Sequence, residues 1–439
     1  SDDGRTWAFT LRQGVTFHDG TPLTSAAVKA SWDRLLDPAT QAPRASLLGG
    51  DNLVSVETPD DNTVVVTHQE PMANFLPNIA RTFAMIISPT AIETYGPDLA
   101  EQMVGTGPFR LQDYVQAGQV TLARWDDFNW APSFFQHEGP AYLDEVTWLS
   151  IEEEGTRIAA IERGELDIGR LPWSQFQRFN TGFPGLSVTT ISNPGIPAGV
   201  YLNSQLAPLD DQRVREALAL VVDREAIVQS PSYVDAVWVE LGPLTADMLG
   251  YDPASTEAWP PYDVERAAGL LAEAGFTAGA DGIMERDGEP LVLTLATSSL
   301  TLPLGQILQS QFGAIGVGLE VTPLDAAAVS AQWDAGGDHL TLGANTGNDP
   351  DVLWDVFHTG QRGHVEDPLV DDLLEQGRIT VDPDERLSIY SELQTYLAGQ
   401  VYTIHIYNSA RNYAVADRVN GVSFNDRAGI YIYDIWVDG

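Results

Sequence analysis

The stretch TWAFTLRQGVTFHDGTPLTSAAVKASWDRLLDP, residues 6–38, decides the fold more than any other part of the chain. Apolar and polar side chains alternate from Trp7 to Leu11, which predicts a strand. A second short strand should end in the turn His18–Pro22, because Asp-Gly and Pro favour turns. A helix capped at Thr24 or Ser25 should follow. The stretch therefore predicts a corner built from two strands and a helix.

Three further segments carry distinctive patterns in the same order along the chain. They are GTGPFRL at residues 105–111, RIAAIERGELDI at 157–168, and YLN at 201–203 followed by PLDDQRVREAL at 208–218. Together with residues 6–38, these segments resemble the family 5 extracellular solute-binding proteins, which deliver peptides, nickel complexes and related solutes to ABC importers. With four matches in register, the chain is identified as a member of that family.

The resemblance implies an α/β fold: a two-lobe, periplasmic-binding-protein-like clamp of type II, in its large three-part variant. Residues 1–104 would form a subdomain of the first lobe, 105–205 together with 405–439 its core, and 206–404 the second lobe. The chain would cross between the lobes near Tyr201 and Tyr407, an arrangement that permits hinge closure. The resemblance also implies that family members have further first-lobe residues, including a strand, before the position of Ser1.

Length and composition limit the other possibilities. A chain of 439 residues is longer than one compact core usually requires, so two or three domains are expected. The net charge of −39 opposes binding to nucleic acid or to an anionic membrane surface. The lack of cysteine excludes disulfides, thiolate metal sites and thiol nucleophiles. No run of 18 apolar residues predicts a membrane span.

The loop Asn345–Trp354 is the main candidate for ligand contact in the second lobe. Peptide-binding members of the family usually carry Asp-Tyr-x-Asp-Pro here, and the first Asp pairs with the ammonium group of the peptide. Asp349-Pro350 matches the end of that motif, but Thr346 stands in the place of the anchoring Asp. A buried ammonium without a carboxylate costs several kcal/mol, roughly, so we expect weak or absent binding of short peptides through free amino termini. The alternative role for Asp349 and Asn348 is to cap the following helix.

Nickel-binding members of the family suggest a different ligand. They hold a metal chelate with arginines, aromatic residues and one loop histidine, and Arg44 and Arg81 lie near comparable positions of this chain. His358 and His364 follow Asp349-Pro350 and are the candidate metal contacts, although Ser46 replaces the aromatic residue expected after the arginine. We favour an anionic or neutral polar solute held by the arginines, because a guanidinium keeps its charge and donates two hydrogen bonds to a carboxylate.

The sequence thus predicts a monomer, periplasmic or extracellular with a lipid anchor as one option, that captures a small solute between two lobes. The solute would be oligopeptide-like or another polar or anionic compound, and the partners would be the permease subunits of an ABC importer. We expect no catalytic residues, no cofactor and no resident metal. A hydrolase is the alternative from another class, but no pair of carboxylates marks one. The expected ligand contacts are Arg44, Arg81, Tyr201, Asn203, Asn345, Thr346, Asn348, Trp354 and Tyr407.

Overall fold

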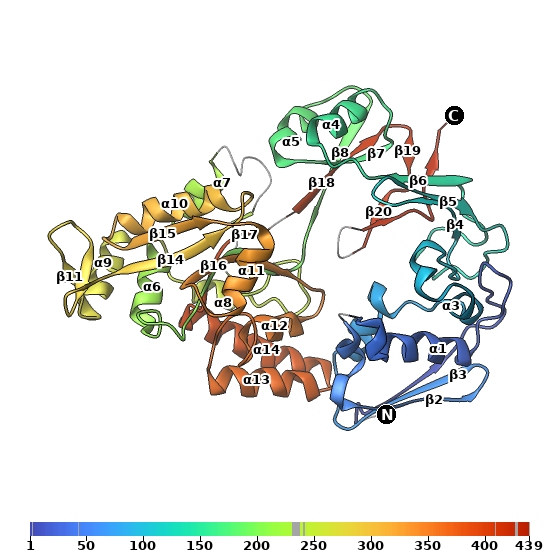
Figure 1. Cartoon of the computed structure of the whole chain (residues 1–439), viewed down its shortest axis with the longest axis horizontal. Helices are drawn as coiled ribbons and strands as arrows, with labels where there is room; N and C mark the ends of the chain where they lie inside the picture. The colour runs from blue at the N-terminus through green and yellow to red at the C-terminus, as the bar shows by residue number, and fades with distance from the viewer. Residues whose placement is uncertain are drawn as a thin grey trace.

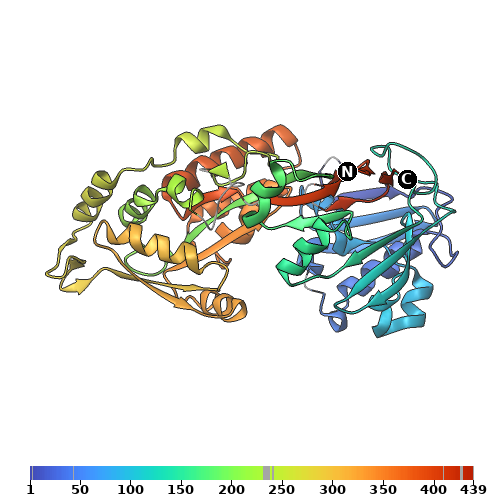
Figure 2. The same cartoon turned by 90° about the horizontal axis from the view of Figure 1, so that it is seen from above.

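The computed structural model describes residues 1, 3–42, 44–230, 238–239, 242–408, 410–425 and 429–438. Figures 1 and 2 show two lobes side by side, with both ends of the chain in the same lobe. This first lobe contains the N-terminal part of the chain and its last strands, whereas the second lobe contains the middle. Within the described residues, no helix combines the length and the apolar character needed to cross a bilayer.

The N-terminal part of the first lobe contains the corner that residues 6–38 predict. One helix packs its buried Trp32 against the valines of a three-stranded antiparallel sheet. The expected second strand is reduced to a single bridge between Thr16 and Pro22. The elements are β1 (Thr6–Thr10), β2 (Leu53–Asp60), β3 (Thr63–His68), α1 (Ser25–Leu36), α2 (Phe75–Ile79), α3 (Pro89–Tyr95) and the 3₁₀ turns η1 (Pro38–Thr40), η2 (Ala45–Leu48), η3 (Gly50–Asn52), η4 (Thr82–Ala84) and η5 (Gly96–Glu101).

Two further three-stranded sheets and the two-stranded sheets β19-β22 and β20-β21 belong to the described part of the first lobe. The antiparallel sheet β4-β5-β6 comes from consecutive strands, whereas the sheet β7-β18-β8 places a strand from the C-terminal part of the chain between two earlier ones. The elements are β4 (Phe109–Val115), β5 (Gln119–Arg124), β6 (Glu145–Leu149), α4 (Glu154–Glu162), β7 (Ile168–Leu171), α5 (Trp173–Asn180), β8 (Leu186–Ser192), β18 (Ala410–Ala416), β19 (Val419–Asn420), β20 (Ser423–Phe424), β21 (Ile430–Tyr431) and β22 (Trp436–Val437).

The second lobe is built around one sheet with the strand order β10-β17-β9-β16-β14-β15. The pattern of residues 290–321 predicts a βαβ unit, and the structure has it as two parallel strands joined by α10. The sheet strands are β9 (Gly195–Leu202), β10 (Trp238–Val239), β14 (Val292–Thr297), β15 (Gly318–Pro323), β16 (Leu340–Thr346) and β17 (Thr403–Asn408), and a small hairpin sheet contains β11 (Thr277–Ala278), β12 (Met284–Arg286) and β13 (Glu289–Pro290).

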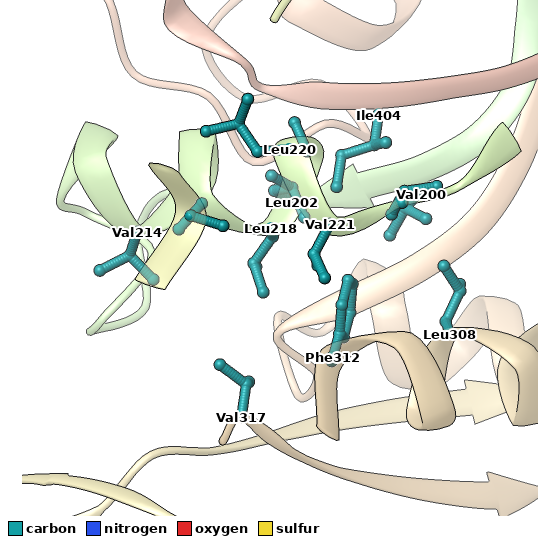
Figure 3. Close-up of a cluster of buried hydrophobic side chains, with 14 of the residues drawn as sticks. Val200, Leu202, Val214, Leu218, Leu220, Val221, Leu308, Phe312, Val317 and Ile404 are labelled. Carbon is teal, nitrogen blue, oxygen red and sulfur yellow. The ribbon is translucent and has the colours of Figure 1, made fainter. Parts of the chain in front are cut away.

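Helices cover this sheet and enclose its core. Val200 and Leu202 of β9 meet Ile404 of β17, Leu218 and Phe312 in a cluster that is almost fully buried (Figure 3). Burying each such side chain contributes about 1.5–3 kcal/mol. The helices are α6 (Gln212–Val221), α7 (Arg224–Val228), α8 (Pro253–Glu257), α9 (Val264–Glu273), α10 (Leu302–Gly313), α11 (Ala326–Asp334), α12 (Trp354–Phe357), α13 (Pro368–Ile379), α14 (Pro383–Gln400) and the 3₁₀ turn η6 (Pro350–Leu353).

The chain enters the second lobe before Tyr201, near which the sequence predicts the crossing, and it leaves the lobe close to the predicted Tyr407. Every residue of β9 is buried, and β9 lies between β16 and β17 in the second-lobe sheet. The chain therefore enters the second lobe between Ser192 and Gly195 and leaves it between Asn408 and Ala410. The apolar pattern of these strands predicts burial, but it does not indicate in which lobe they are buried.

Candidate functional site

The N-terminal part of the first lobe touches the second lobe directly. The Ala73 amide donates to the Arg378 carbonyl over 2.8 Å, and Asn74 Nδ2 donates to Asp351 Oδ2 over 2.6 Å. Beside these bonds lies a cavity of about 600 Å³, lined by residues of segment 46–78 on one side and of segment 354–379 on the other. We call it the interlobe cavity. Its size is in the range of small-molecule sites, and two lobes contribute to its wall.

Trp354 forms a rigid wall of the interlobe cavity. Its ring stacks on His358 with centroids 3.7 Å apart, and the Arg378 guanidinium lies 3.5 Å from its centroid. Arg378 is itself fixed, because it donates to both carboxylate oxygens of Asp351 over 2.6 and 3.0 Å. A cation held against an indole face stabilises both groups. Trp354, which the sequence suggests as a ligand contact, therefore presents a fixed aromatic surface.

Asp355 also lines the interlobe cavity, and three arginines lie within electrostatic range of it. Its surface is open to the cavity, yet the surrounding protein desolvates the carboxyl and raises its pKa above the usual range, an effect to which Asp351 adds. Arg378, Arg81 and Arg44 act in the opposite direction. Of the predicted contacts, Trp354 lines the interlobe cavity, whereas Arg44 and Arg81 do not line it but lie within electrostatic range of Asp355.

Two residues of this site are missed by the sequence reasoning. Asp355 directly follows Trp354 but matches no motif, and Arg378 lies near the end of a helix far along the chain. A signal for Asp355 was available, because it is an acid beside a predicted cleft tryptophan. For Arg378 no local signal exists, since only the packing of α13 against η6 and α12 places it there.

The predicted contacts at the end of β16 lie next to the first residue of β9. Thr346 is exposed and pairs with Gly195, whereas Asn345 and Asn348 are half-buried. Asp349 is buried, accepts from the Asp351 amide and forms an ion pair with Arg386, so it has the capping role of the alternative interpretation. None of the first three lines the interlobe cavity; they flank the point where the chain enters the second lobe.

Tyr201, Asn203 and Tyr407 lie elsewhere than the sequence suggests. Tyr201 is 6% exposed within an apolar cluster, and burial raises the pKa of its hydroxyl. Asn203 is 1% exposed and uses its amide to bond the Asp338 carbonyl and the Gln205 amide. Tyr407 is half-buried against the second-lobe core. Tyr201 and Asn203 lie inside the second lobe because the chain enters that lobe before them, whereas Tyr407 lies close to the point at which the chain leaves it.

The two histidines suggested as metal contacts are held by other groups. His364 Nε2 lies 2.7 Å from the Trp333 carbonyl, and His358 stacks on Trp354 with its Nδ1 2.9 Å from the Thr359 carbonyl. Within the described part of the chain, no three His, Asp or Glu side chains converge as a metal site would require.

Comparison of the sequence with known protein families identifies the family of this chain. The sequence profile of the bacterial extracellular solute-binding proteins, family 5 (middle region), matches residues 1–364. The chain belongs to this family. The match confirms the predicted membership and the predicted function, a solute-binding protein of an ABC importer, and it excludes the hydrolase alternative because the family binds solutes without catalysis.

Individual relatives support the same assignment. The glutathione-binding protein GsiB of Escherichia coli (strain K12) is 29% identical over 416 residues, covering 90% of this chain and 76% of the relative. The structure of AgaA from A. tumefaciens R10 with agropinic acid is 26% identical, with a TM-score of 0.77 and coverage of 100% of this chain and 88% of AgaA. NikA of Brucella suis with Fe(III)-EDTA has a TM-score of 0.85 at 22% identity, covering 100% of this chain and 89% of NikA, which shows the shared fold. These likenesses confirm the predicted α/β clamp.

Proposed function

We propose that this chain captures a small peptide-like solute bearing carboxylates, outside the cytoplasm, and presents it to the permease subunits of an ABC importer. One observation carries the ligand class: Trp354, Asp355 and Arg378 line a cavity of about 600 Å³, and Arg44 and Arg81 of the first lobe lie within electrostatic range of Asp355. Because both lobes supply charged groups, a solute that pairs with groups of both lobes stabilises the closed conformation, in which the lobes are in contact.

The charges at this site are mixed: Glu70, Asp355, Glu375 and Arg378 line the cavity, and Arg44 and Arg81 lie within electrostatic range of Asp355. The first-lobe arginines suit a carboxylate, since a guanidinium forms two parallel hydrogen bonds with it. Asp355 suits an ammonium group, and neutralising it would also relieve the desolvation that raises its pKa. A solute with both kinds of group, such as a short peptide derivative, therefore matches the site better than a simple anion. Asp355 would supply the carboxylate that Thr346 lacks.

Two relatives support this choice of ligand class. GsiB is a glutathione-binding protein, and AgaA is described with agropinic acid. Glutathione is a tripeptide with two carboxylates and one amino group, and agropinic acid is a carboxylic acid. Both relatives have sequence identities above those of the peptide and nickel-complex binders of known structure.

Thermal unfolding in the presence of single solutes tests the proposal, because a ligand that binds only the native state raises Tm by mass action. The panel contains glutathione, opines, dipeptides, nickel-histidine complexes and neutral sugars. We expect stabilisation by glutathione-like or opine-like compounds. Stabilisation by sugars or nickel complexes alone would overturn the assigned ligand class.

The arginines should carry much of the affinity. Arg81→Ala and Arg44→Ala are each expected to weaken binding of the stabilising carboxylate solute more than tenfold, about 1.4 kcal/mol. Calorimetric titration measures this effect. Arg163→Ala is the matched control, because Arg163 is an exposed arginine of the first lobe that pairs with Glu165. Equal affinities for Arg81→Ala, Arg44→Ala and Arg163→Ala would contradict the assigned role.

Asp355 should recognise the amino group. We expect Asp355→Asn to weaken binding of the unmodified solute, but to leave binding of its N-acetylated form unchanged, because acetylation already removes the ammonium. Titration of both forms against both proteins gives a double comparison. If Asp355→Asn weakens binding of the unmodified and the N-acetylated solute equally, Asp355 does not pair with the ammonium group of the solute.

A further inference from the structure

A second cavity, of about 250 Å³, lies in the first lobe away from the interlobe cavity. Its lining includes Arg157 of α4, Arg170 of β7, Trp173 at the start of α5 and Arg411 of β18. Ala410, the first described residue after the chain returns from the second lobe, also lines it. Three consecutive elements, α4, β7 and α5, thus meet the distant strand β18 here, next to the connection between the lobes. We call it the arginine cavity.

The charge of the arginine cavity contrasts with that of the whole chain. Three arginines line it and no carboxylate does, although the chain has 62 acidic residues against 23 basic ones. Most arginine side chains engaged elsewhere pair with an acid, as Arg163 does with Glu165. Among the ion pairs of the described residues, neither Arg157 nor Arg170 takes part. The charges of Arg157 and Arg170 would favour an anion placed beside them.

The position of Arg157 is fixed by the backbone. Its Nη1 donates to the Ile151 carbonyl over 2.8 Å, and its Nε donates to the Arg170 carbonyl over 3.2 Å. These two bonds leave other N–H groups of the guanidinium for a ligand. The second bond also joins α4 to β7. It therefore fixes the position of the Arg157 side chain relative to the strand that carries Arg170. A preorganised guanidinium loses less entropy on binding than a free one.

The start of α5 adds positive potential. Its N-cap is Pro172, which offers no side-chain acceptor to the first turn. Other helices, such as α4 and α13, begin at an acidic side chain that accepts from the helix amides, whereas α1 and α10 resemble α5 in this respect. Pro172 and Trp173 both line the cavity, so the first turn of α5 lies at its wall, where the Ser174 hydroxyl donates to Glu154 over 3.3 Å. The helix dipole favours negative charge at this position.

From this combination we infer that the arginine cavity is a binding site for the oxyanion of a small solute, a carboxylate or a phosphate, separate from the interlobe cavity. The guanidinium groups of Arg157 and Arg170 grip the oxyanion, the first turn of α5 supports it, and the half-buried Trp173 ring packs against the carbon atoms that carry it. The volume accommodates a group of a few heavy atoms rather than a peptide. An occupied site joins α4, β7, α5 and β18 beside the strand connection about which the lobes move.

Calorimetric titration with succinate and with inorganic phosphate, each at constant ionic strength balanced with NaCl, tests this site. We expect saturable binding of at least one of them to the wild-type chain, and the stronger of the two identifies the chemistry of the ligand. Arg170 is exposed, so Arg170→Ala should preserve the fold while weakening that binding more than tenfold, and Arg170→Lys should weaken it less. Binding should also change the tryptophan fluorescence, and Trp173→Phe should remove most of that change.

A control separates this site from other arginines. Arg266→Ala removes the same charge from a helix of the second lobe and should leave succinate or phosphate binding unchanged. The inference is overturned if neither anion binds saturably, if Arg170→Ala binds as the wild type does, or if Arg266→Ala weakens binding as much as Arg170→Ala does. Because the variants differ from those that test the interlobe cavity, either site can fail without the other.

Discussion

Asp349→Asn should destabilise the second lobe by about 3–5 kcal/mol, the usual cost of breaking a buried ion pair. Asp349 accepts two hydrogen bonds from Arg386, over 2.6 and 2.9 Å, and both side chains are about a tenth exposed. Burial alone would lower the pKa of Arg386, but the bonds to Asp349 raise it above the ordinary arginine value. The substitution would therefore leave a charged guanidinium in the protein interior without its counter-ion.

Urea unfolding of wild type and variant measures this loss. Glu165→Gln removes the acid of the exposed Arg163 pair and should leave the unfolding midpoint nearly unchanged. The double change Asp349→Leu with Arg386→Met should recover much of the stability, because it removes both charges from the interior. A midpoint for Asp349→Asn equal to that of Glu165→Gln would show that the pair contributes little.

The ion pair also supports the site. Asp349 caps η6, and η6 leads directly into Trp354 and Asp355 at the interlobe cavity. Arg386 reaches back to the Gly377 carbonyl beside Arg378. The pair thus joins both segments of the second lobe that line the interlobe cavity, so its removal should weaken ligand binding as well as stability.

The sequence predicts local structure well where a periodic pattern extends over a whole element. The strand-helix-strand pattern of residues 290–321 forms β14, α10 and β15, whereas the short strand expected before the turn His18–Pro22 is a single bridge. The capping interpretation of Asp349 also describes the structure, because a helix start is specified by residues close in sequence. The family motifs supplied the global plan that periodicity cannot give.

The misplaced features depend on contacts between distant segments. The apolar pattern of β9 identifies a buried strand, but only its pairing with β16 and β17 places it in the second lobe, so Tyr201 and Asn203 lie in the core. Arg378 and the arginine cavity have no local pattern. The side chains of the arginine cavity come from residues 157, 170 and 411, and only the β7-β18-β8 sheet brings them together.

His405 should make the second lobe unstable in acid. The imidazole is fully enclosed in β17, and burial, together with the positive charge of Arg224, lowers its pKa from 6.5 to about 3. Between these two values the unfolded chain binds a proton that the native chain does not. The free energy of unfolding should therefore fall as the pH drops from about 6.5 toward 3, by up to about 1.4 kcal/mol per pH unit from this residue.

His405→Gln isolates this contribution. Glutamine can keep the contact that His405 Nε2 makes with Thr403 Oγ1 over 2.8 Å, but it does not titrate. Urea unfolding between pH 7 and 4 should show a smaller loss of stability for the variant than for wild type. The difference between the two slopes of unfolding free energy against pH should approach the value for one bound proton. Other groups titrate equally in both proteins, so they cancel in the comparison. Thr403→Val removes the same hydrogen bond while keeping the imidazole, and it should retain the wild-type slope. Identical slopes for His405→Gln and wild type would mean that His405 binds a proton equally well in the native and unfolded chain.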